Sequence, residues 1–149
     1  MAVNEDFMGR EYPPLPPVDV TAEWVGEFAS SVGATNAVHH DARAARDAGF
    51  DDVVAPPTFA VVIAQKADAQ LIEDPEAGID FTRVVHGQQS FTHHTPIVAG
   101  MQISAVLHVD AVRSAGGHVM VTTRSELSDA DGSPVCTASS TIVIRGEQS

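Results

Sequence analysis

The chain has very little of several residue types that define common protein classes. It holds one cysteine among 149 residues, so no disulfide bond can form within the chain. Only eight lysines and arginines face twenty aspartates and glutamates, which gives a formal net charge of −12. Phosphate backbones and anionic lipid surfaces are bound by clustered basic residues. We therefore expect neither nucleic acid nor membrane as a partner.

Long apolar runs are also missing, as is an N-terminal leader with a charged, an apolar and a small-residue section. We therefore expect a cytoplasmic protein. The apolar fraction of 44% and the charged fraction of 19% are typical of a folded chain. The length predicts one domain over residues 1–149. Cys136 lies in PVCTASSTIVI, which predicts a small buried residue on a late strand.

The first half of the chain predicts an extended arm followed by helices. Prolines 13, 14, 16 and 17 exclude a helix or a central strand, so we expect an edge strand or a wrapping arm. Apolar spacing and a Thr21 cap predict a helix over 22–31, and a shorter one follows near 41–47. The longest helical pattern begins at Pro57, is apolar over most of its circumference, and ends at Asp74-Pro75.

The second half of the chain changes to a period of two residues. The segments FTRVVHGQQSFTHHTPIVAG, MQISAVLHVDAVRSAGG, HVMVTTRSELSDADGS and PVCTASSTIVIRG predict four strands. Turns are expected at Gly100, at Gly116-Gly117 and at Asp131-Gly132. Helices followed by antiparallel strands indicate an α+β fold, with the helices on one face of a single sheet and the long helix wrapped by it.

Acid–base chemistry is suggested by GATNAVHHD at residues 33–41. His39 and His40 precede the short helix, which Asp41 is placed to cap. Either one of these histidines is a general base, or the two form a hydrogen-bonded loop pair. A second group comprises His86, His93 and His94. On a regular strand His93 and His94 point to opposite faces, so they cannot share a metal ion, and no metal motif accompanies them.

The chain resembles the hotdog-fold, MaoC-like hydratases and dehydratases that act on (3R)-hydroxyacyl thioesters. More narrowly, it is similar to the non-catalytic half of the actinobacterial two-subunit (3R)-hydroxyacyl-ACP dehydratase. The resemblance is carried by REYPP, GATNAVHHDARAARDAG, VVAPPTF, VVHGQQSFTHHTPIVAG and RSAGG. It implies a curved antiparallel sheet around one central helix, dimers joined sheet edge to sheet edge, and no cofactor. It also implies that the strand with His93 and His94 serves sheet pairing and forms part of the pocket lid.

Catalytic members of that family carry an aspartate, four residues, then a histidine, and a glycine amide at the start of the central helix. The histidine matches His39, but the aspartate position holds Ala34 and the glycine position holds Pro57. A methyl group cannot orient water, and proline has no N–H to polarise a thioester oxygen. A shift of one residue in the match would bring the Thr58 N–H to that position instead.

The resemblance therefore predicts a non-catalytic, acyl-chain-binding subunit of a (3R)-3-hydroxyacyl-thioester dehydratase. Its partner would be a hotdog subunit with an intact Asp-x4-His motif, and its ligand an acyl-CoA or acyl-ACP thioester. Two alternatives stay open: a homodimeric hydratase that uses His39, and a thioester-binding structural homodimer without turnover. Phe59, Val62, Ile63 and Ala67 are expected either to line an acyl tunnel or to fill the core.

An acidic carrier protein would need a locally basic docking face on so acidic a chain. The basic residues available for such a face are Arg43, Arg46, Lys66, Arg83 and Arg113.

Overall fold

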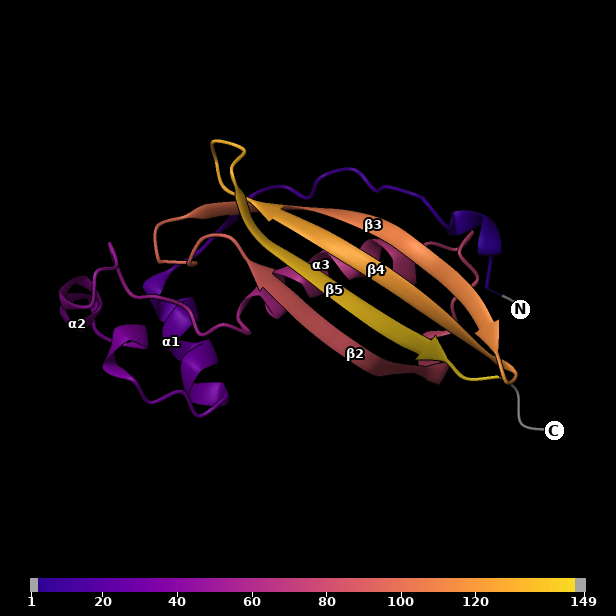
Figure 1. The fold of residues 1–149 in the computed structure, drawn as a ribbon, viewed down its shortest axis with the longest axis horizontal. Helices are drawn as coiled ribbons and strands as arrows, with labels where there is room; N and C mark the ends of the chain where they lie inside the picture. The colour runs from indigo at the N-terminus through magenta and orange to yellow at the C-terminus, as the bar shows by residue number, and fades with distance from the viewer. Residues whose placement is uncertain (1–2, 147–149) are drawn as a thin grey trace.

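A computed structural model describes residues 3–146. One five-stranded antiparallel sheet, in the order β1-β3-β4-β5-β2, curves around the helix α3 (Figure 1). The strands are β1 (Val18–Asp19), β2 (Val84–His93), β3 (Gln102–Ala115), β4 (His118–Ser128) and β5 (Pro134–Ile144). The four strands predicted from the two-residue period are confirmed. So are the turns between them, where Gly100, Gly116, Gly117 and Gly132 have positive φ angles.

The proline-rich N-terminal segment runs as an arm along the outer edge of β3. After the short 3-10 helix η1 (Glu5–Phe7), the Tyr12 and Leu15 amides donate to carbonyls of β3, and the two-residue strand β1 completes the pairing. The expectation of an edge strand or a wrapping arm is confirmed, because β1 is a short edge strand and the residues before it form an arm along β3. Since proline has no N–H to offer a further strand, this edge of the sheet is closed to pairing.

Helices α1 (Ala22–Ser31) and α2 (Ala42–Asp47) lie beyond one end of the sheet, opposite both chain ends (Figure 1). Each begins where its sequence signals predict. The Thr21 hydroxyl accepts from the Trp24 amide at 3.1 Å, and the Asp41 carboxylate accepts from the Arg43 amide at 2.9 Å. Between them, the 3-10 helix η2 (Ala37–His39) carries the His39 imidazole.

Helix α3 (Ala60–Ile72) starts three residues later than predicted, which corrects the placement of Pro57 at the first helical position. Residues 57–59 form turns, and Phe59 is the residue that caps the helix. The Phe59 ring is fully buried and makes edge-to-face contacts with two other rings. Its centroid lies 4.9 Å from that of Trp24 and 5.4 Å from that of Phe28. These contacts fix the chain before the helix, because a buried aromatic cluster tolerates little displacement.

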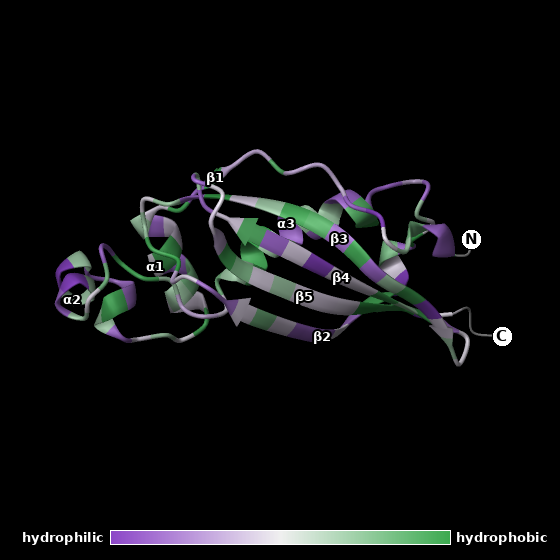
Figure 2. Ribbon diagram, turned by 45° about the horizontal axis from the view of Figure 1, so that its top comes forward, coloured by the Kyte–Doolittle hydropathy of each residue, from purple (hydrophilic) through white to green (hydrophobic). Residues whose placement is uncertain are grey.

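The core lies between α3 and the concave face of the sheet. Ile63, Ala67 and Leu71 recur every four residues on the buried side of α3. Burial alternates along β4, where Val121, Thr123, Ser125 and Leu127 are buried, so one face of the strand packs on the helix and the other faces outward. Figure 2 shows strongly hydrophilic and near-neutral residues along the middle of this strand. Cys136 is fully buried in β5, as predicted. Within residues 3–146 no helix is long and apolar enough to span a membrane.

The arm is tied to the end of α3 by Tyr12, and this contact generates a pH-dependent prediction. The Tyr12 hydroxyl donates to the Asp74 carboxylate at 2.9 Å. Burial, followed by the hydrogen bond to Asp74 and the charge of that residue, raises the pKa of Tyr12 to about 12. Because the folded-state pKa lies above the unfolded value of about 10, this stabilisation is complete below pH 10 and is lost as the pH rises to about 12.

Replacing Tyr12 by phenylalanine should lower the free energy of unfolding by about 1 kcal/mol at pH 7, because it removes one hydrogen bond. In urea titrations, the free energy of unfolding of the wild type should also fall more steeply between pH 10 and 12 than that of Tyr12→Phe. The raised pKa of Cys136 is common to both proteins and cancels in the difference. Equal slopes would show that the Tyr12–Asp74 bond does not hold the arm.

Candidate functional site

A cavity of about 520 Å³ lies where η2, the segment before α3 and the end of β2 meet. Pairing of distant segments brings these three together. The Ala55 amide donates to the Ile97 carbonyl at 2.8 Å, and the Ala99 amide donates to the Val53 carbonyl at 3.0 Å. The walls are mostly apolar, and the polar side chains among the residues that line it are Asn36, His39, His93, His94 and Thr95.

His39 is held in the cavity wall by the peptide groups of Val54. Its Nδ1 donates to the Val54 carbonyl at 2.6 Å, while the Val54 amide donates to the Val38 carbonyl at 3.0 Å. A carbonyl oxygen can only accept, so the neutral ring carries its hydrogen on Nδ1 and its lone pair on Nε2. No described residue binds Nε2, so this nitrogen is left for a ligand or a proton.

His40 is also bonded to the backbone, but in the opposite tautomer. Its Nε2 donates to the carbonyl of Ala34 at 2.9 Å. Asp41 is occupied by the cap of α2, and neither histidine has a carboxylate partner in the described chain. The interpretation as a hydrogen-bonded loop pair thus holds for both histidines. For His39, the role of base is still chemically open because one nitrogen has its lone pair available.

The resemblance matches the catalytic aspartate to Ala34 and the glycine amide to Pro57, and neither residue offers a carboxylate or an N–H donor. Ala34 does not line the cavity, and its side chain is a methyl group. Pro56 and Pro57 both line it, and neither has an N–H. The Thr58 amide, the alternative donor, has no hydrogen-bond partner among the described residues, but Thr58 is not part of the cavity wall. No aspartate or glutamate is among the described residues that line this cavity.

The expectation that His93 and His94 face opposite sides of a regular strand stays a prediction, because β2 ends at His93. Both residues are among those that border the same cavity as His39, while Nε2 of His94 lies 3.3 Å from the Thr137 hydroxyl. The His93 ring stacks on Phe91 with centroids 5.9 Å apart. Sequence reasoning did not predict that both residues border this cavity, and it did not single out Asn36; the available signal was His-His-Thr-Pro, since a proline close behind marks the end of a strand. Within residues 3–146, no three His, Cys, Asp or Glu side chains are grouped so as to hold a metal ion.

The four residues of the predicted acyl tunnel lie in the core, and none of them lines the cavity that contains His39. Phe59, Ile63 and Ala67 are fully buried or nearly so, and Val62 is half-buried against the core. Their role toward an acyl chain stays a prediction. The five basic residues also do not form one face, because Arg43 and Arg46 lie on α2, whereas Arg83 and Arg113 belong to the opposite end of the molecule (Figure 1).

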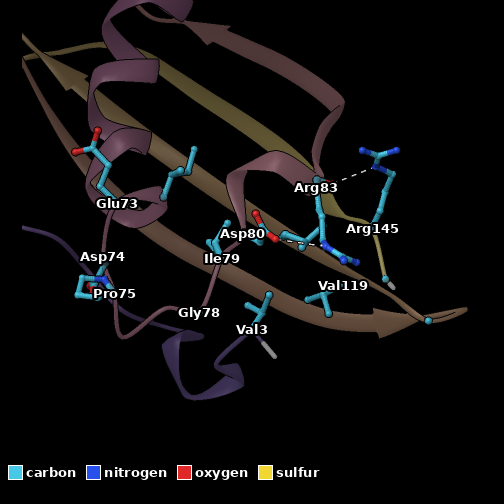
Figure 3. Close-up of a pocket in the computed structure, with 14 residues that line it drawn as sticks. Val3, Glu73, Asp74, Pro75, Gly78, Ile79, Asp80, Arg83, Val119 and Arg145 are labelled. Carbon is cyan, nitrogen blue, oxygen red and sulfur yellow. Dashed lines mark hydrogen bonds and ion pairs between the residues drawn. The ribbon is translucent and has the colours of Figure 1, made fainter. Parts of the chain in front are cut away.

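A larger cavity of about 770 Å³ lies at that opposite end, where α3 ends and β2 begins (Figure 3). None of the residues singled out as candidate catalytic groups lines it. Its charged groups are mainly paired: Arg83 with Asp80 at 3.4 Å, and Asp74 with Arg10 at 3.6 Å. The volume of a cavity therefore does not identify the functional site. The smaller cavity, which three histidines border, is the better candidate.

A family model described as FAS1-like, dehydratase domain region, matches residues 6–138. The chain belongs to this dehydratase-domain family. Relatives in the family are the UPF0336 proteins of Leifsonia xyli and Saccharopolyspora erythraea, 51% and 47% identical to this chain. Each match covers 98% of this chain, and the matches cover 98% and 94% of those proteins respectively.

Solved structures of dehydratases share the fold. A chain of the C-terminally truncated HadBC (3R-hydroxyacyl-ACP dehydratase) complex of Mycobacterium tuberculosis is 29% identical, with a TM-score of 0.83 over 93% of this chain and 97% of that one. A MaoC-like dehydratase is 30% identical, with a TM-score of 0.88 over 95% of this chain and 43% of that one. These likenesses confirm the hotdog fold and the MaoC-like resemblance expected from the sequence.

The opposite tautomers of His39 and His40 can be tested in one spectrum. At pH 8.5, where imidazoles are largely neutral, ¹⁵N-correlated NMR should show Nδ1 protonated in His39 and Nε2 protonated in His40. His40 serves as the internal control, since it occupies the same loop and differs in its carbonyl partner. A His39 ring protonated on Nε2 would mean that the Val54 carbonyl does not orient it.

Proposed function

We propose that this chain is the non-catalytic, acyl-thioester-binding subunit of a two-subunit (3R)-3-hydroxyacyl-thioester dehydratase. The observation that carries the proposal is the composition of the His39 cavity. It combines an apolar wall and an oriented imidazole with two prolines at the start of α3, and no described carboxylate lines it. Residues 1–149 would form one MaoC-like hotdog domain, working in the cytoplasm on a CoA or carrier-bound acyl group.

The expected losses in catalytic rate favour a binding role over turnover. Loss of one oxyanion donor costs about 10²–10³ in kcat. Loss of a positioned acid–base group costs about 10²–10⁴. Both groups are absent from the positions where the family places them, at Pro57 and Ala34, so His39 alone would leave little of the family's rate.

The open edge of the sheet supports a partner subunit. Strand β2 pairs with β5 on one side only, and the arm already covers the other edge of the sheet. The side chains of Phe81 and Val85, near the start of β2, are 67% and 44% exposed. A second hotdog sheet that pairs along β2 would cover this edge and supply the missing aspartate and glycine amide. HadBC, to which this chain is similar, is itself a complex.

The purified chain should hydrate crotonyl-CoA no faster than its His39→Ala variant, because the groups that assist the imidazole are absent. Co-expression with a hotdog subunit that carries an intact Asp-x4-His motif should give a stable 1:1 complex with strong hydratase activity. Enoyl absorbance measures the rate, and size-exclusion chromatography with light scattering measures the stoichiometry.

Matched variants separate the two subunits in that complex. His39→Ala should leave the activity of the complex within about a factor of three, whereas alanine at the partner's motif histidine should abolish it. Rapid hydration by the isolated chain that disappears in His39→Ala would instead establish the homodimeric hydratase and rule out the proposal.

A further inference from the structure

A half-buried carboxylate lies between α3 and the inner face of the sheet, outside both cavities. Asp68 is on α3, and one of its oxygens accepts a hydrogen bond from the Thr123 hydroxyl at 3.1 Å. No residue within 3–146 donates to its other oxygen. Burial raises the pKa of Asp68, and the Thr123 bond and the charge of His86 offset this effect only in part. The ionised form of Asp68 is therefore incompletely satisfied in the isolated chain.

Polar side chains lead from Asp68 to the free edge of the sheet. Thr123 on β4 is paired with Ser140 on β5, and their hydroxyl oxygens lie 3.4 Å apart. Ser140 is paired in turn with Gln89 on β2, and directly opposite residues lie on the same face of a sheet. His86, whose charge acts on Asp68, is also on β2. Strand β2 is the edge strand, so this polar row ends where a partner sheet would join (Figure 1).

The elements that hold Asp68 and Thr123 bring no lysine or arginine to this carboxylate. Lys66 is the only such residue on α3, and its ammonium lies 5.6 Å from the centroid of the Trp24 ring. Arg124 is the only one on β4, and two carboxylates bind it on the outer face of the sheet, opposite to the face of Thr123. A cation that pairs with Asp68 would have to come from another molecule.

We infer that Asp68 is a recognition point for the partner subunit, which places a lysine or arginine against this carboxylate. The inference rests on the proposed function, because it assumes that a second hotdog subunit joins along β2. Burial leaves the carboxylate poorly satisfied in the isolated chain, and the same burial strengthens its attraction to a cation. A second copy of this chain would bring a further formal charge of −12 to the same face, so charge complementarity favours a less acidic partner.

In the isolated chain, Asp68→Asn should raise the free energy of unfolding at pH 7. The variant removes the charge and keeps an oxygen that can accept from Thr123. Because the folded-state pKa of Asp68 lies above its unfolded value of about 3.9, ionisation lowers the stability of the wild type above the folded-state pKa. This loss disappears as the pH falls, so the difference between variant and wild type should shrink. Urea titrations at pH 7 and at lower pH measure both effects.

In the complex, the same variant should have the opposite effect. The titrant is a separately purified hotdog subunit that carries an intact Asp-x4-His motif. Calorimetry should show at least about tenfold weaker binding of this subunit to Asp68→Asn than to the wild type, because the cation of the partner loses its counter-charge. Asp47→Asn is the matched control, since Asp47 is exposed on α2 and the change removes the same unit of charge. It should leave the dissociation constant within about a factor of two.

An aspartate that serves only the fold would behave differently. Binding of Asp68→Asn within about a factor of two of the wild type would overturn the inference. So would weaker binding combined with a less stable isolated chain, because the variant would then disturb the fold. Equal weakening by Asp68→Asn and Asp47→Asn would also overturn it, since overall charge would then control the association.

The outcomes separate this inference from the proposed function. If an active complex forms and binds Asp68→Asn as tightly as the wild type, the proposed function stands and only the inference is wrong. If the complex depends on Asp68 but His39→Ala abolishes its activity, the inference stands and the non-catalytic role is wrong. If no such subunit binds the chain, both are wrong.

Discussion

The cavity depends on the two hydrogen bonds made by the backbone of Val54. Its amide fixes η2 through the Val38 carbonyl, and its carbonyl fixes the ring of His39. The neighbouring residues Val53 and Ala55 are bonded in turn to the segment that follows β2. This loop has little regular structure, but partners distant in sequence satisfy its backbone groups.

The hydrogen bonds of Val54 orient His39 independently of the residues at positions 34 and 57. Under the proposed function, the His39 ring would be held by Val54, while Ala34 and Pro57 would stand where catalytic relatives carry an aspartate and a glycine. Packing of Phe59 against Trp24 and Phe28 holds the start of α3 in place, whatever residue occupies position 57.

The sequence alone predicted the elements well, because capping residues and apolar periods act locally. Thr21 and Asp41 marked two helix starts correctly, and the two-residue period marked the strands. It failed at Pro57, because α3 begins three residues later, and it did not predict that His93 and His94 border the same cavity as His39.

The proline-rich arm has a consequence for how the protein can assemble. A sheet with two free edges can add neighbours at both sides and grow without limit, as fibrils do. Here the arm, whose four prolines lack N–H donors, occupies the β3 side, and only β2 is left to receive a companion. Joining along that edge uses up the last pairing surface of the sheet, so this mode of growth ends at two.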